Sequence, residues 1–144
     1  MDVKCAFLNG DITEEIYMQQ PQGFSTNPSL VCKLRKSLYG LKQAPRAWYA
    51  KIDSFLLSLN FLRCKSDPNV YLKSINGSLM IILLYVDDLL ITRSSQVKIA
   101  SLKGAMNQAF SMTDLGLLSQ FLGLEISQTK LESRCTNPNM PWTC

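Results

Sequence analysis

Apolar residues recur at every third or fourth position after Pro45, which is the spacing of one face of an α-helix. Proline is favoured in the first turn of a helix, so the pattern predicts a helix over residues 45–60. A less regular apolar pattern follows Ser95, a residue type that caps helices, and predicts a second helix through Phe110. The defining apolar residues are Trp48, Ile52, Phe55, Leu56 and Leu59 in the first helix, and Val97, Ile99, Leu102, Met106 and Phe110 in the second.

Short apolar runs bounded by turn residues predict β-strands around these helices. The strongest hairpin signal is Asn76-Gly77, which separates a strand at residues 70–74 from one at 79–86. The second of these runs is apolar throughout, which is typical of a strand buried on both faces. Further strands are predicted at residues 2–7, 15–18, 30–34, 89–92 and 120–126.

The order of these elements indicates the fold class. Strand, helix, strand pair, helix and strand predict an α+β fold, with an antiparallel sheet and both helices on one face. The split βαβ arrangement of ferredoxin-like domains has this order. The chain of 144 residues has the length of one domain or of part of one, and we place its core in residues 1–127. Residues 128–144 lack a sustained apolar period, which predicts an irregular tail.

Composition restricts the possible chemistry. Hydrophobic residues make up 47% and charged residues 18% of the chain, which indicates a packed core. The absence of histidine excludes imidazole bases, and five cysteines without a Cys-x-x-Cys pair argue against structural zinc or a disulfide framework. No apolar run approaches the ~20 residues of a membrane span. No secretory signal follows Met1, so we expect an intracellular protein that is neither secreted nor embedded in a membrane.

The net charge of +4 conceals a basic stretch in the first half of the chain. No acidic residue lies between Glu15 and Asp53, whereas six basic residues do. Clustered cations favour a polyanion such as a nucleic-acid backbone. The alternative is a solvated basic face that binds no partner. The six residues are Lys33, Arg35, Lys36, Lys42, Arg46 and Lys51.

Asp87 and Asp88 directly follow the longest apolar run. Adjacent carboxylates beside a buried strand raise each other's pKa unless a cation neutralises them, and Mg²⁺ prefers such ligands together with substrate phosphates. The alternative is an ordinary solvated turn. A sheet could bring Asp2 beside the pair. Three carboxylates at one sheet end would suit two-metal phosphoryl transfer, which requires no histidine.

Several segments resemble, in order, the motifs of copia-type LTR-retrotransposon reverse transcriptases, and the resemblance extends from Asp2 to Ser127. Leu84-Tyr85-Val86-Asp87-Asp88 contains the Tyr-x-Asp-Asp box of these enzymes. The other similar segments are residues 2–11, 15–24, 36–49, 114–116 and 121–123.

The resemblance implies the palm subdomain of a right-hand polymerase, with fingers and thumb largely missing. Its activity would be RNA-directed DNA synthesis, and its partners a template-primer of RNA or DNA and a dNTP. Asp2, Asp87 and Asp88 would be the catalytic residues and would hold two Mg²⁺ ions. By the same resemblance Phe7, Tyr39, Gly40 and Tyr85 would contact the nucleotide, with Phe7 excluding a 2′-OH, whereas Lys42, Arg46, Leu122 and Gly123 would contact nucleic acid.

The chain departs from the family pattern at both ends. Family members have an upstream fingers region and continue downstream into further polymerase and RNase H sequence, which residues 131–144 do not resemble. We therefore expect a piece of a polyprotein, truncated at both ends, that is inactive alone and self-associates through an uncovered sheet edge. Two alternatives stay open: a non-functional transposon remnant and a non-catalytic RNA-binding module.

Overall fold

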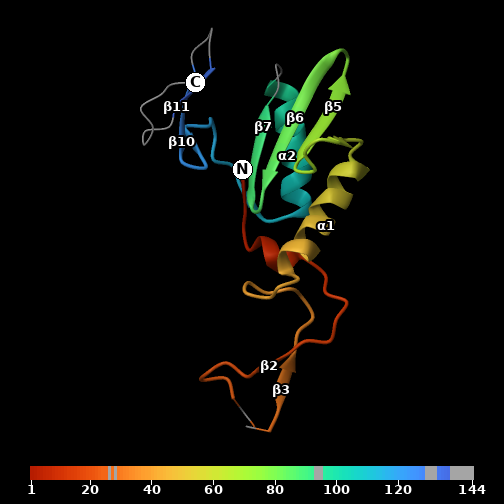
Figure 1. Cartoon of the computed structure of the whole chain (residues 1–144), viewed down its shortest axis with the longest axis vertical. Coiled ribbons are helices and arrows are strands. Elements are labelled where there is room, and N and C mark those ends of the chain that lie inside the picture. The colour runs from red at the N-terminus through yellow and green to blue at the C-terminus, as the bar shows by residue number, and fades with distance from the viewer. Residues whose placement is uncertain (26, 28, 93–95, 129–132, 137–144) are drawn as a thin grey trace.

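The computed structural model describes residues 1–25, 27, 29–92, 96–128 and 133–136. Its centre is a six-stranded antiparallel sheet in the order β4-β5-β6-β7-β1-β8, packed against two helices (Figure 1). The antiparallel α+β organisation expected from the sequence is therefore confirmed. The strands of this sheet are β1 (Asp2–Val3), β4 (Leu62–Arg63), β5 (Val70–Ile75), β6 (Ser78–Tyr85), β7 (Asp88–Thr92) and β8 (Met112–Thr113), and the helices are α1 (Ala44–Ser58) and α2 (Gln96–Ala109).

The strand order places β1 inside the sheet although it is the first element of the chain. β7 lies between β1 and β6 and pairs antiparallel with both, so β1 and β6 run parallel to each other. The connection from β1 to β6 contains α1, which makes this part a split βαβ unit. In the same way β1 lies between β7 and β8, whose connection contains α2. A two-residue strand from the start of the chain is thus held between β7 and β8.

The hydrophobic core lies between the sheet and the helices. The apolar stripe predicted for α1 is confirmed, because Trp48, Ile52 and Leu56 are buried. Trp48 packs edge-to-face against Phe110, with ring centroids 5.3 Å apart. In α2 the predicted stripe is only partly buried, since Val97 is 80% exposed. Ser95, the predicted cap of this helix, lies outside the described residues.

The prediction that the run at residues 79–86 is buried on both faces is wrong. Along β6, Met80, Ile82 and Leu84 are buried, whereas Leu79 is 52% exposed. The helices pack on one face only, so alternate residues of an entirely apolar strand face away from the core. The hairpin itself is confirmed: Asn76 and Gly77 have φ of 53° and 74°, as a two-residue type I′ turn requires.

The predicted strand at residues 2–7 is much shorter in the structure. β1 ends at Val3, Cys5 adopts a left-handed φ of 51°, and the chain continues as a 3₁₀ helix, η1 (Ala6–Asn9). This turn directs the chain towards α1. Gly10 then approaches the helix so closely that an added Cβ would lie 2.8 Å from the backbone nitrogen of Trp48. Packing against α1 therefore overrides the extended pattern of the sequence.

The predicted strand at residues 120–126 is a hairpin, because the chain reverses at Leu122 and Gly123, which have φ of 50° and 78°. Its strands are β9 (Gln120–Phe121) and β10 (Leu124–Gln128). A further strand, β11 (Ser133–Thr136), pairs antiparallel with β10. The tail predicted as irregular therefore contributes one strand, while its last eight residues lie outside the described part.

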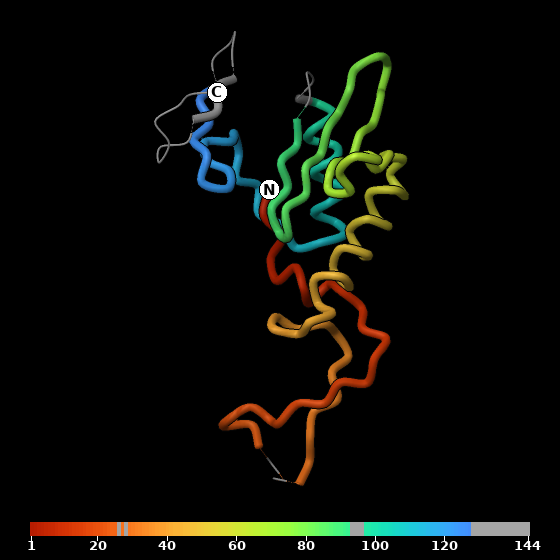
Figure 2. The backbone as a smooth tube through the Cα atoms, viewed as in Figure 1, coloured from red at the N-terminus to blue at the C-terminus, as the bar shows by residue number. Residues whose placement is uncertain are grey.

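Another hairpin projects from the end of the molecule that lies away from β9 and β10 (Figure 2). It consists of β2 (Tyr17–Gln19) and β3 (Val31–Lys33), which the sequence predicted within a residue or two. Tyr17 and Val31 are more than half exposed on it. The sheet edge that was expected to be uncovered at the first strand is absent, because β1 lies between β7 and β8. Self-association itself stays a prediction.

Candidate active site

Asp2 and Asp88 lie directly opposite each other on neighbouring strands. Met1 and Leu89 exchange two backbone hydrogen bonds of 2.8 Å, and the amide of Val3 donates to the carbonyl of Asp87 at 2.8 Å. The pair between them is therefore a non-hydrogen-bonded pair of the ladder. In such pairs the Cα atoms are about 4.5 Å apart and the two side chains share one face. The structure therefore brings together Asp2, from the first of the similar segments, and Asp88, from the Tyr-x-Asp-Asp box.

The sheet also determines which face these carboxylates occupy. Val3 and Leu89, their neighbours along the strands, are buried on the helix face. Because successive side chains of a strand alternate between faces, Asp2 and Asp88 point to the other face. Both are partly exposed, and Asp87 in the adjoining turn is exposed. All three carboxylates are therefore accessible to solvent on that face.

Asp87 belongs to the tight turn that joins β6 to β7. Tyr85 pairs with Asp88, which leaves Val86 and Asp87 as the two central residues. Val86 has a φ of 54°. A positive φ at the first central position is the geometry of a type II′ turn, where glycine is the favoured residue. A β-branched residue in this position is strained by about 1–3 kcal/mol.

The electrostatics reflect the gathering of negative charge. Burial, followed by repulsion from Asp87 and Asp2, raises the pKa of Asp88 above its usual value. Within the described residues, no three Asp, Glu, Cys or His side chains are already gathered as a metal-binding group. Mg²⁺ takes only one or two carboxylates from a protein and completes its shell with water and phosphate oxygens. The opposed Asp2 and Asp88 are two carboxylates of the kind that such a donor set would use.

The predicted nucleotide-contacting residues come from three segments: η1, the loop before α1 and the end of β6. Phe7 and Tyr39 are brought together, with ring centroids 5.8 Å apart. The hydroxyl of Ser37 donates to the carbonyl of Phe7, which connects the Tyr39 loop to η1. Tyr39 is 83% exposed, and Gly40 beside it has a φ of 93°, a conformation that favours glycine. Tyr85 is half exposed at the end of β6.

The basic stretch has no acidic residue of its own, yet three of its six cations form ion pairs with acidic residues that precede it. Lys36 and Lys51 form ion pairs of 2.9 and 2.8 Å with Asp11, and Lys33 pairs with Glu15. Hydrogen bonds from Lys51 and Lys36 lower the pKa of Asp11 to about 2. Asp11 and Glu15 precede the basic stretch in the sequence, and folding places them beside its lysines.

Lys42 and Arg46 differ from these paired cations. Both are exposed around the first turn of α1. No ion pair with either side chain occurs in the part of the chain that the structure describes. Their charges are therefore available to an external anion.

Leu122 and Gly123 lie apart from the strands that carry the aspartates. They form the turn of the β9–β10 hairpin, which belongs to the separate sheet with β11. Leu122 is 53% exposed. The predicted contact of these residues with a primer end stays a prediction.

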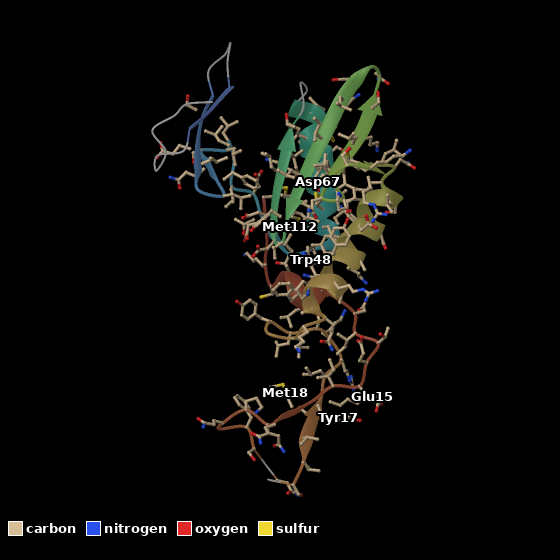
Figure 3. The ribbon with its side chains drawn as sticks, viewed as in Figure 1. Glu15, Tyr17, Met18, Trp48, Asp67 and Met112 are labelled. Atoms are coloured by element: carbon tan, nitrogen blue, oxygen red, sulfur yellow. The ribbon has the colours of Figure 1, made fainter. Side chains whose placement is uncertain are left out.

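Sequence reasoning missed one polar contact at the site. Trp48 was identified only as part of the apolar stripe of α1, yet its indole N–H donates to the carbonyl of Val86 at 2.6 Å. Figure 3 shows Trp48 in the body of the molecule, away from the projecting hairpin that carries Glu15. The only hint in the sequence is that a buried tryptophan requires an acceptor for its N–H.

The chain is similar to known proteins along most of its length. The family model described as "Reverse transcriptase (RNA-dependent DNA polymerase)" matches residues 1–138. The match continues past residue 127, where the sequence predicted that the core ends. The chain is 54% identical over 129 residues to the retrovirus-related Pol polyprotein from transposon TNT 1-94 of Nicotiana tabacum, with 88% of the chain covered. It is 43% identical over 127 residues to that from transposon RE1 of Arabidopsis thaliana, with 87% covered.

A more distant relative is the transposon Ty1-BR Gag-Pol polyprotein of Saccharomyces cerevisiae, 33% identical over 136 residues and 88% of the chain. The chain covers 10%, 9% and 7% of the lengths of these three polyproteins. No solved structure matches it significantly. Among the described residues, no helix has the length and apolar character that a bilayer crossing requires.

Proposed function

Because this chain belongs to the reverse transcriptase (RNA-dependent DNA polymerase) family, we propose that it forms the metal-binding palm segment of an RNA-directed DNA polymerase. The observation that carries the proposal is the pairing of Asp2 with Asp88, beside the turn that presents Asp87. Relatives of this chain are parts of much longer polyproteins, so the complete enzyme would include further polypeptide. The reaction is transfer of a nucleotide from a dNTP to a primer 3′-OH.

Each aspartate has a part in this reaction. Asp2 and Asp88 would hold the two Mg²⁺ ions from neighbouring strands, and Asp87 would add a third carboxylate from the turn. Bound Mg²⁺ would supply activation of the primer hydroxyl and neutralise charge on the α-phosphate as pyrophosphate leaves. The rigid ladder keeps the carboxylates in register, so the metal ligands require little reorganisation when substrate binds.

Phe7 and Tyr39 form the proposed nucleotide-contacting surface. Their rings contact each other, and the Ser37 hydrogen bond fixes the loop that carries Tyr39. An aromatic side chain beneath the sugar would exclude a 2′-OH by collision. The exposed face of Tyr39 leaves room for a base or sugar to pack against it.

Metal binding can be tested on this chain without polymerase activity. Mn²⁺, a spectroscopic substitute for Mg²⁺, should bind to the chain, and Asp88→Asn should weaken the binding by about tenfold or more, because it removes one of two opposed carboxylate ligands. Free Mn²⁺ can be measured by electron paramagnetic resonance. Glu15→Gln, the same loss of charge on the projecting hairpin, serves as the control and should bind like the wild type. Equal affinity in Asp88→Asn and wild type would exclude the assigned ligand role.

Nucleic-acid binding should depend on Lys42 and Arg46 more than on the paired cations. We expect Lys42→Gln with Arg46→Gln to weaken binding to an RNA–DNA primer-template and to reduce the slope of log K against log salt by about 1–2, because two phosphate contacts are lost. Fluorescence anisotropy at several salt concentrations measures both quantities. Lys33→Gln with Lys36→Gln removes the same charge from residues that are already ion-paired. An equal effect of both double variants would show that net charge alone determines binding.

A further inference from the structure

The turn that carries Asp87 adopts a conformation that its own sequence disfavours. Val86 stands at φ 54°, where a β-branched side chain is a conformational outlier. The side chain of Val86 is 45% exposed and borders a cavity of about 200 Å³ that Phe7, Trp48 and Leu84 also line. Close packing on this side therefore does not hold the turn. Something else must hold Val86 in the strained conformation.

Hydrogen bonds from two different elements supply that restraint. The amide of Val3 in β1 donates to the carbonyl of Asp87 at 2.8 Å. The indole N–H of Trp48 in α1 donates to the carbonyl of Val86 at 2.6 Å. The carbonyls of both central residues of the turn are therefore occupied, one by the sheet and one by the helix.

Trp48 is itself held rigidly. Its side chain is 2% exposed, and its ring packs edge-to-face on Phe110. Gly10 packs against the backbone of α1 at Ala47 and Trp48. A donor fixed in this way has little freedom to follow the turn if the turn relaxes. Its N–H, once unpaired, would be a buried donor without an acceptor.

We propose that Trp48 is a positioning residue, whose indole N–H holds the strained Val86 turn and thereby aims Asp87 and Asp88 at the metal ions. In this role Trp48 acts on the aspartates through the carbonyl of Val86. The inference rests on the proposed function for its consequence at the metal site. The hydrogen bond and the turn conformation can be tested independently of that function.

The sharpest test keeps the shape of the side chain and removes only its donor. Trp48→benzothienylalanine, introduced site-specifically, replaces the indole N–H by sulfur in a ring of nearly the same size. Leu56→Ala is the control, because it removes a buried side chain of α1 that takes no part in the ring contact that holds Trp48. NMR of the Val86 and Asp87 amides reports the turn, Mn²⁺ titration reports the metal site, and chemical denaturation reports stability.

We expect the benzothienylalanine variant to shift or broaden the Val86 and Asp87 resonances and to weaken Mn²⁺ binding by about tenfold, a typical effect of losing a group that orients metal ligands. Leu56→Ala should lower stability at least as much as the benzothienylalanine variant does, yet leave the Val86 and Asp87 resonances and the Mn²⁺ affinity near wild type. Unchanged Val86 and Asp87 resonances would overturn the proposal, as would unchanged Mn²⁺ affinity in a chain that binds Mn²⁺. Altered resonances in a chain that never binds Mn²⁺ would support the holding role and refute the proposed function.

Discussion

Asp87→Asn should reduce Mg²⁺-dependent primer extension by about 10³-fold or more in the polyprotein-length enzyme that contains this segment, equivalent to about 4 kcal/mol of lost transition-state stabilisation. The substitution preserves the size of the side chain and removes its charge. Asp87 is exposed in the turn between β6 and β7, so the change should leave the core intact. Single-turnover extension of a labelled primer, measured with saturating template, gives the rate directly.

The matched control for this experiment is Glu15→Gln. Glu15 loses the same charge but lies on the projecting hairpin, where it pairs with Lys33 (Figure 3). Its extension rate should stay within a few-fold of the wild type. If Asp87→Asn retained the wild-type rate, the carboxylate would have no part in metal-dependent transfer, and the second alternative, non-catalytic RNA binding, would become the better explanation.

Gly10→Ala should destabilise the fold by about 1–3 kcal/mol, although alanine differs from glycine by one methyl group. An added Cβ would lie 2.8 Å from the Ser37 hydroxyl oxygen, 2.8 Å from the Trp48 nitrogen and 2.9 Å from the Ala47 carbonyl carbon. Two of these atoms belong to the backbone of α1 and cannot move as a flexible side chain would. Urea denaturation followed by circular dichroism measures the change in the free energy of unfolding.

Gly104→Ala makes the same chemical change, but we expect it to raise the free energy of unfolding. Gly104 lies inside α2, and an added Cβ would meet no atom within 4 Å. Alanine there should stabilise the helix by about 0.5–1 kcal/mol. Stabilisation of both variants would show that Gly10 is not closely packed against α1.

Local patterns sufficed for elements whose structure depends on neighbouring residues. The helical spacing after Pro45 and the Asn76-Gly77 turn correspond to α1 and the β5–β6 hairpin. The same reasoning failed where packing between distant segments decides the conformation. The extended pattern at residues 2–7 becomes a strand of two residues and a 3₁₀ helix, because Gly10 has to reach the side of α1.

The candidate site shows the same division. The types of its residues are evident in the sequence, since Asp2, Asp87 and Asp88 stand in recognisable motifs. That Asp2 faces Asp88 depends on the register of β1 against β7. Register is set by which residues the sheet buries, because a shift of one residue would turn Val3 and Leu89 out of the core.

By itself, then, the amino-acid sequence determined the two helices, the main hairpin, the family and the acidic residues that could perform chemistry. Only the tertiary structure decided that Asp11 neutralises Lys36 and Lys51, and that the N–H of Trp48 is bonded to Val86. Sequence patterns report interactions within a turn of helix or between adjacent strands. Ion pairs and hydrogen bonds between distant segments form only after the burial of apolar surface has placed those segments side by side.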